Sequence, residues 1–181
     1  MVRTRVGYAG GETKNPTYHQ LGDHTETIQI DYDPAQISYQ ELLDVFWDSH
    51  NPTGPALSRQ YMSIVFFHND EQKRLAIETR DREAARINRQ IYTEIVPATE
   101  FYLAEAYHQK HQLRQVPDLV REFETMYPAT DDFTNSTAAA RVNGYLGGYG
   151  TFADLETEMC DLGLSPAGSE KLLNMVYVLK H

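Results

Sequence analysis

The residues best suited to chemistry lie near the start of the chain. Tyr18, His19, His24 and Glu26 fall within nine residues of a loop rich in Gly, Asn, Pro and His. A carboxylic acid that is partly buried beside phenols keeps its proton and can give it to an oxygen that gains charge in a transition state. We therefore predict that Glu26, Tyr18 and the more distant Tyr61 form a proton-donating catalytic set.

This set contains proton donors but no nucleophile. The chain holds twelve tyrosines, so the plainer interpretation is a glutamate at a strand edge with two core tyrosines. Cys160 is the only thiol, and negative charge at Glu156, Glu158 and Asp161 disfavours a reactive thiolate there. Cys160 is therefore expected to be structural or incidental.

Two other motifs have a possible chemistry and a simpler explanation. Glu105 and His108 form a Glu-x-x-His pair, with His111 expected one helical turn later on the same face. Di-iron bundles need two such pairs and two further glutamates, so a hydrogen-bonded helix surface is the better account. Residues 144–150 are rich in glycine but lack the Lys-Ser/Thr of a phosphate loop and follow an apparent helix, which indicates a helix stop and turn. No metal and no cofactor is predicted.

Composition limits the classes of partner. The chain has 181 residues, 41% of them hydrophobic and 23% charged, which suits one globular domain. A net charge of -10 disfavours nucleic acid or an anionic membrane and favours a protein surface or a neutral small molecule. The single cysteine excludes an internal disulfide and a cysteine-based zinc site. Because no long apolar run is present, we expect no membrane span, no signal peptide and a cytoplasmic location.

Periodicity predicts the elements that position the first set. Residues 2–9 and 25–32 alternate as strands do, and residues 12–24 between them form an irregular loop. Ser38 followed by Glu41 is a capping-box pattern that begins a helix.

The remainder of the chain is predicted as strands and helices in alternation, followed by helices alone. Residues 61–68 are too apolar for an edge and are expected to form a central strand. The other expected elements are a helix at 71–89, a strand at 91–96, a helix at 101–115, and short helices at 118–126, 137–146, 154–162 and 169–179. This order indicates an α/β or α+β core with a helical C-terminal extension.

Several short sequence motifs follow one another along the chain, and their order is more specific than any one of them alone. They are VGYAGG, NPTY at 15–18, His24-Thr25-Glu26, Tyr32-Asp33-Pro34, ISYQELLDVFW, His50-Asn-Pro-Thr53, Arg59-Gln60-Tyr61 and TEIVPATEFYLAEAYHQK. Together they resemble the S-epimer-specific peptide methionine sulfoxide reductases, the A-type family, over about residues 3–110. STAAARVNGYLGGYG, from residue 136, resembles the tail of one branch of that family.

The resemblance implies a fold, a reaction and its partners. It implies an α+β fold with a ferredoxin-like mixed β-sheet core flanked by helices, a domain at residues 1–127, and a helical extension at 128–181 packed on it. In the family, a thiolate attacks the sulfur of methionine S-sulfoxide, in oxidised proteins or the free amino acid, and thioredoxin restores the thiol. A glutamate and two tyrosines bind and protonate the oxygen; by resemblance these are Glu26, Tyr18 and Tyr61. The implied role is protein repair under oxidative stress.

The sequence also departs from the family's pattern at several places. The Gly-Cys-Phe-Trp-Gly segment that supplies the thiolate is absent, and with it the family's first strand and the helix that carries the cysteine. The loop between Tyr18 and Glu26 is shorter than usual, and Ala56 stands near the place of a common aspartate. We expect that this segment lies upstream of Met1 and that the chain as written is inactive and truncated. The alternative is a cysteine-less, non-enzymatic relative that binds methionine sulfoxide or acts as a scaffold.

Overall fold

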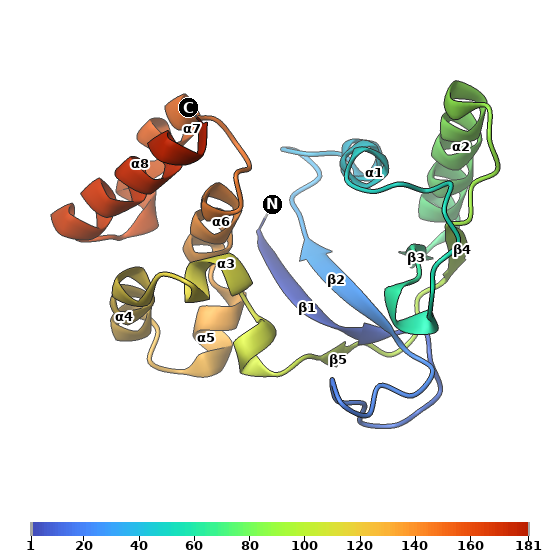
Figure 1. Ribbon diagram of the computed structural model, residues 1–181, viewed down its shortest axis with the longest axis horizontal. Coiled ribbons are helices and arrows are strands. Elements are labelled where there is room, and N and C mark those ends of the chain that lie inside the picture. Colours follow the sequence, from blue (N-terminus) through green and yellow to red (C-terminus); the bar gives the residue numbers. More distant parts are fainter. Residues whose placement is uncertain (1, 181) are drawn as a thin grey trace. The chain divides into compact units, whose positions relative to one another are not determined.

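The computed structural model describes residues 2–180, which form two compact units (Figure 1). The first unit is Val6–Ala104, and the second contains Val2–Arg5 together with residues 105–180. The predicted domain boundary at residues 127 and 128 stays a prediction. The α+β class is confirmed, with the strands in two small sheets.

The first sheet contains the two strands predicted at the start of the chain. Its order is β2-β1-β5, from β1 (Arg3–Ala9), β2 (Thr25–Asp31) and β5 (Tyr102–Leu103). β1 runs antiparallel to β5, with Gly7 opposite Leu103. The loop of residues 10–24 therefore connects two neighbouring strands of one sheet.

The second sheet has two parallel strands, β3 (Ile64–Phe67) and β4 (Glu94–Pro97). Parallel strands need a crossover connection, and α2 (Asp70–Ile87) lies within it. The predicted central strand at 61–68 is wrong in length and place, because β3 has four residues and pairs only with β4 among the described residues. Tyr61 lies before it in the 3-10 helix Arg59–Tyr61.

Helix α1 (Tyr39–Asp48) begins where the capping box predicts. The N–H of Glu41 donates to Oγ of Ser38 at 3.2 Å, and the N–H of Ser38 donates to Oε2 of Glu41 at 2.7 Å. The helix buries Trp47, whose indole N–H donates to Oγ1 of Thr79 at 3.0 Å. This contact attaches α1 to α2 and fixes the wall that α1 presents to the candidate site.

The helix predicted at residues 101–115 is wrong. The segment divides into β5, a 3-10 helix (Ala106–His108) and the short helix α3 (His111–Arg114). Pairing of Tyr102 with Tyr8 of β1 holds the first part extended, and Lys110 has a left-handed backbone with φ of 55° that interrupts a helix. Long-range pairing overrides local helix propensity here.

After residue 105, the regular elements in the described part of the second unit are all helices, joined by short turns and loops. Its further helices are α4 (Pro117–Met126), α5 (Thr130–Asn135), α6 (Thr137–Leu146), α7 (Phe152–Glu158) and α8 (Pro166–Lys180), with a 3-10 helix (Met159–Leu162) after α7. They enclose an apolar core that includes Leu113, Phe123, Val142, Leu155 and Leu172. The predicted run of helices is confirmed, and α5 is an addition to it.

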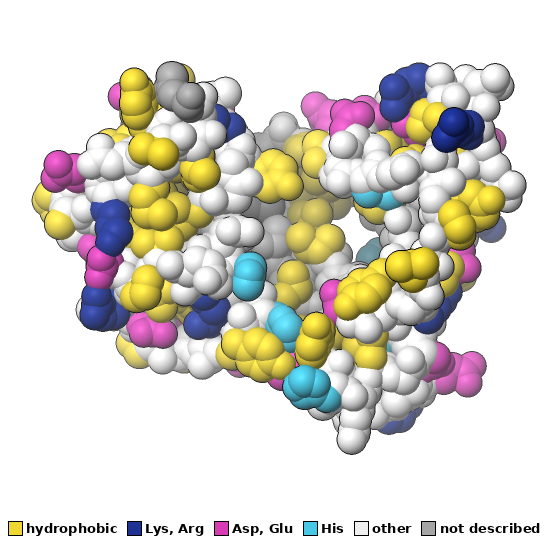
Figure 2. All heavy atoms as spheres, viewed as in Figure 1, with side chains coloured by type: hydrophobic (Ala, Val, Ile, Leu, Met, Phe, Trp, Pro, Cys, Tyr) yellow, Lys and Arg dark blue, Asp and Glu magenta, His cyan; other side chains and the backbone are white. Residues whose placement is uncertain are grey.

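On the face shown in Figure 2, Lys and Arg side chains are scattered and often lie beside Asp or Glu. They form no large basic cluster on that face. Arg74, for example, lies 2.7 Å from carboxylate oxygens of both Glu71 and Glu78. Among the described residues, no helix has the length and apolar character needed to cross a membrane.

Candidate active site

The loop that carries Tyr18 is fixed by the carboxylate of Asp23. This carboxylate accepts from the N–H of Glu12 at 2.8 Å, and from the N–H and hydroxyl of Thr13 at 3.1 and 2.8 Å. These donors, with the N–H of Glu12 contributing most, hold the pKa of Asp23 well below its ordinary value. An ionised Asp23 therefore joins the two ends of the loop.

His24 is a second anchor of the same loop and is fully buried. Its Nδ1 accepts from the N–H of Gly11 at 3.3 Å, so Nε2 carries the hydrogen and donates to the carbonyl of Thr13 at 2.8 Å. The ring also lies edge-on to Tyr102, with 5.4 Å between ring centroids. His24 is therefore a structural residue that positions the start of β2, two residues before Glu26.

Glu26 is the second residue of β2, and its side chain is exposed. Its Oε1 accepts from the side-chain amide of Gln60 at 2.7 Å. The partial burial that the sequence suggested is not found, because no described element covers this end of β2 deeply enough to bury the carboxyl group. The carboxyl group is held by a hydrogen bond and is accessible to a ligand.

Tyr61 lies close to both Tyr18 and Glu26. The pKa of Tyr61 is raised, first by the charge on the neighbouring Tyr18 phenol, then by partial desolvation, by the Glu26 carboxylate and by a hydrogen bond with Tyr18. Exposed fractions of 38% for Tyr18 and 61% for Tyr61 leave both phenols open to a ligand. The structure thus brings the three predicted residues together.

The 3-10 helix that carries Tyr61 is attached to three strands. The hydroxyl of Thr25, at the start of β2, donates to the carbonyl of Arg59 at 2.8 Å. The guanidinium of Arg59 donates to Glu94 of β4 at 2.9 Å and to the carbonyl of Gly10, just after β1, at 3.4 Å. These contacts place Gln60 and Tyr61 beside Glu26.

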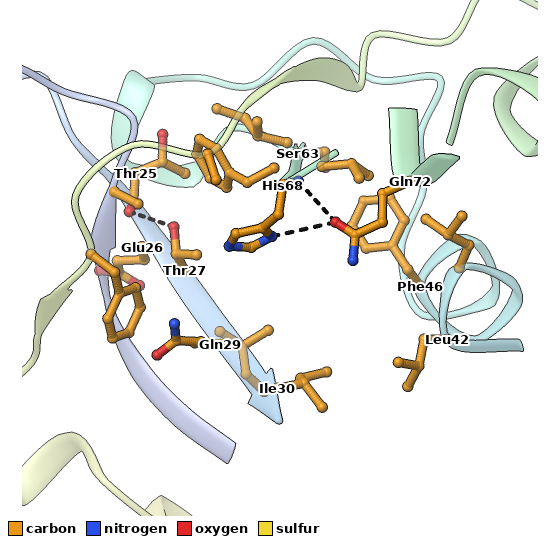
Figure 3. A pocket seen from close by; sticks show the side chains of 18 of the residues that line it. Thr25, Glu26, Thr27, Gln29, Ile30, Leu42, Phe46, Ser63, His68 and Gln72 are labelled. Atoms are coloured by element: carbon orange, nitrogen blue, oxygen red, sulfur yellow. Dashed lines mark hydrogen bonds between the residues drawn. The ribbon is translucent and has the colours of Figure 1, made fainter. Parts of the chain in front are cut away.

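Glu26 lies on the wall of a cavity of about 410 Å³ in the first unit (Figure 3). β2 forms one side, and Leu42 and Phe46 of α1 lie on the opposite side. Six consecutive residues of β2, 25–30, line it, as do residues 62–66 in and before β3. Successive side chains of a strand point to opposite faces, so the cavity lies along strand edges. Within the described residues β2 pairs only with β1 and β3 only with β4, so both edges are unpaired.

The other candidate residues do not assemble a site. Glu105, His108 and His111 do not share one helix, and His108 Nε2 lies 4.0 Å from the nearest Glu105 oxygen. The described residues contain no group of three His, Cys, Asp or Glu side chains arranged to hold a metal. Gly147 follows the end of α6, in agreement with a helix stop. Cys160 is exposed in the second unit.

Sequence reasoning missed Gln60 as a site residue and Asp23 as an organiser of the loop. Gln60 had one signal, its place beside Tyr61, but a glutamine next to a tyrosine is too common to indicate a contact with Glu26. Asp23 directly precedes His24, yet its contacts to Glu12 and Thr13 depend on loop geometry.

Comparisons with known proteins give a consistent result. Residues 1–141 match the sequence model of a family described as peptide methionine sulfoxide reductase, and residues 130–176 match one described as selenoprotein methionine sulfoxide reductase A, helical domain. A peptide methionine sulfoxide reductase of Drosophila melanogaster is 43% identical over 92% of this chain and 67% of its own length. Peptide methionine sulfoxide reductase A5 of Arabidopsis thaliana is 41% identical over 80% of this chain and 59% of its own length.

A solved structure agrees with these matches. The crystal structure of Mxr1 from Saccharomyces cerevisiae in reduced form is 32% identical, has a TM-score of 0.57, and is matched over 63% of this chain and 71% of the yeast chain. The chain spans about three fifths to two thirds of the length of the insect and plant relatives named above.

Proposed function

The chain belongs to the peptide methionine sulfoxide reductase family, and from this membership we propose that it serves the reduction of methionine S-sulfoxide, bound as a residue of an oxidised protein or as the free amino acid. The observation that carries the proposal is the proximity of Tyr61 to both Tyr18 and Glu26, with Glu26 on the wall of the cavity. We assign Glu26 as the proton donor because a bound sulfoxide covers its exposed carboxyl group and thereby favours the neutral form, and the two phenols hold the sulfoxide oxygen by hydrogen bonds.

The reaction requires more than this proton donor. Reduction of a sulfoxide by two thiols yields a sulfide, a disulfide and one water, so the oxygen must leave sulfur as a nucleophile attacks it. Protonation of that oxygen by Glu26 stabilises the charge that develops on it. Glu26, Tyr18 and Tyr61 supply no electrons, and thioredoxin is the reductant that we propose for the complete reaction.

We propose that the nucleophile comes from outside these 181 residues. The single cysteine, Cys160, is surrounded by Glu156, Glu158 and Asp161, and this negative charge disfavours a reactive thiolate. Within the described residues the edges of β2 and β3 that line the cavity have no strand partner, which supports the presence of a further extended segment, because such edges readily pair with another strand. The description of the helical-domain family as a selenoprotein makes a selenol an alternative to a thiol.

The test separates binding from turnover. Methionine S-sulfoxide added to the 181-residue chain should shift the NMR signals of Glu26, Tyr18 and Tyr61, while dithiothreitol should yield no methionine. Glu26→Ala should weaken binding, whereas Glu12→Ala, in the same loop region, should leave it unchanged. Production of methionine by this chain would overturn the proposed source of the nucleophile, and the absence of any binding would overturn the proposed site.

The second candidate is a binding protein without chemistry. It is favoured by one observation: the chain has proton donors, but its single cysteine, Cys160, lies among acidic residues that disfavour a thiolate. The protein isolated from its native source distinguishes the two, since only the first candidate predicts reduction of methionine S-sulfoxide by that protein.

A further inference from the structure

The contact between Gln60 and Glu26 assigns a role to a residue outside the three predicted ones. The side-chain amide of Gln60 donates to Oε1 of Glu26 at 2.7 Å. We propose that Gln60 is a positioning residue for the acid: it holds Oε1 as an acceptor, so that Oε2 is the oxygen that carries the proton toward the sulfoxide. This inference rests on the proposed function, because it assumes that Glu26 is the proton donor.

Gln60 is held in place before a ligand arrives. It is half-buried and is the middle residue of the 3-10 helix Arg59–Tyr61. Thr25, the neighbour of Glu26 in sequence, donates its hydroxyl hydrogen to the carbonyl of Arg59 at 2.8 Å. The residues that flank the donor and the acceptor are thus joined directly, which limits the relative movement of Gln60 and Glu26.

The hydrogen bond between the Gln60 amide and the Glu26 carboxyl group determines which carboxyl oxygen carries the proton. An amide N–H donates and cannot accept, whereas a neutral carboxyl group has one carbonyl oxygen and one hydroxyl. When the N–H of Gln60 occupies Oε1, the hydroxyl is on Oε2 of Glu26. After the proton leaves for the sulfoxide oxygen, the same N–H donates to a carboxylate, and charge-assisted hydrogen bonds of this kind are stronger than neutral ones. Gln60 therefore supports both states of Glu26 without contact with the substrate.

The first measurement tests the hydrogen bond without any ligand. In the 181-residue chain, the ¹⁵N and ¹H signals of the Gln60 side-chain amide should differ from those of a glutamine amide in water. Glu26→Ala should move them to the values of an exposed glutamine, and Glu12→Ala should leave them in place. Signals that do not respond to Glu26→Ala would overturn the inference whatever the fate of the proposed function.

The second measurement tests the role in binding. The dissociation constant for methionine S-sulfoxide should rise about fivefold in Gln60→Ala, because the ligand must then order the side chain of Glu26 itself. Gln60→Glu has nearly the same size but places a carboxylate beside the carboxyl group of Glu26, where both can only accept. The dissociation constant should therefore rise more in Gln60→Glu than in Gln60→Ala. Gln36→Ala, an exposed glutamine of the same unit, is the matched control and should bind as the unmodified chain does.

A double-mutant cycle identifies the residue through which Gln60 acts. In a chain that already carries Glu26→Ala, the change Gln60→Ala should have no further effect on the dissociation constant. An equal further loss in that background would overturn the inference, because Gln60 would then act on the fold. An unmodified chain that shows the amide signature but binds no methionine S-sulfoxide would instead identify the proposed function as the part that failed, and the positioning role would fall with it.

Discussion

Lys110 is buried in the second unit. We expect its loss of a proton to change the free energy of unfolding between about pH 8 and 10.5. The residue is 5% exposed, and its ammonium group donates to the carbonyl of Thr4 at 2.6 Å and to that of Thr134 at 2.9 Å. Burial lowers the pKa of Lys110 to about 8 from an ordinary value of 10.5, and the charge of Arg5 acts in the same direction. The perturbation that we consider is Lys110→Met, which keeps the length of the side chain and removes the titration.

The sign follows from proton binding in the folded and unfolded states. Between about pH 8 and 10.5, Lys110 of the unfolded chain holds a proton that the folded chain has released. Stability rises with pH wherever the unfolded state binds more protons. Each tenfold difference in proton affinity contributes about 1.4 kcal/mol, so Lys110 should add about 3 kcal/mol to the free energy of unfolding across this interval.

The assay is urea unfolding of both proteins at intervals from pH 7.5 to 10.5. Tyrosines also titrate in this range, but they are present in both proteins, so the difference between the two free energies isolates Lys110. The unmodified chain should gain about 3 kcal/mol relative to Lys110→Met as pH rises. Lys73→Met, at an exposed lysine, should show no such difference. Parallel pH profiles for the unmodified chain and Lys110→Met would refute the reasoning.

Three further changes test the packing and the loop. Trp47→Phe removes the indole N–H that donates to Thr79 and part of a buried ring, so urea unfolding should show a loss of about 2 kcal/mol. Phe123→Ala empties a fully buried position in the core of the second unit and should cost about 4 kcal/mol in the same assay. Asp23→Asn should speed hydrogen exchange at the amide of Thr13 at pH 7; the unmodified chain should lose this protection only as acid protonates Asp23, whose pKa is low. Unchanged exchange in Asp23→Asn would show that other contacts hold the loop.

Elements defined by short-range chemistry were predictable from the sequence. The capping box at Ser38 and Glu41 is a local pattern, and α1 begins there. The alternation in residues 2–9 and 25–32 likewise agrees with β1 and β2. In these segments the side-chain pattern and the final contacts favour the same structure.

Elements defined by distant contacts were not predictable. Residues 101–115 have a helical pattern, but Tyr102 pairs with β1, nearly a hundred residues away, and Lys110 adopts a left-handed backbone. The apolar run at 61–68 indicated burial correctly for Val65, yet a run of that kind does not specify how many strands pair beside it.

The same distinction applies to the candidate site. Residue type identified Glu26, Tyr18 and Tyr61, and the structure places them together. The hydrogen bond from Gln60 and the exposure of Glu26 depend on how the 3-10 helix meets β2, which the sequence pattern does not reveal.

The central claim is that Glu26 belongs to a reductase site whose nucleophile lies outside these 181 residues. The most direct test treats the active protein from its native source with an alkylating agent specific for thiols and selenols, and locates the modified residue by peptide mass spectrometry. The account predicts that loss of methionine S-sulfoxide reduction parallels alkylation of a cysteine or selenocysteine that precedes or follows this sequence. Loss of activity that parallels alkylation of Cys160, together with loss of activity in Cys160→Ser, would contradict it.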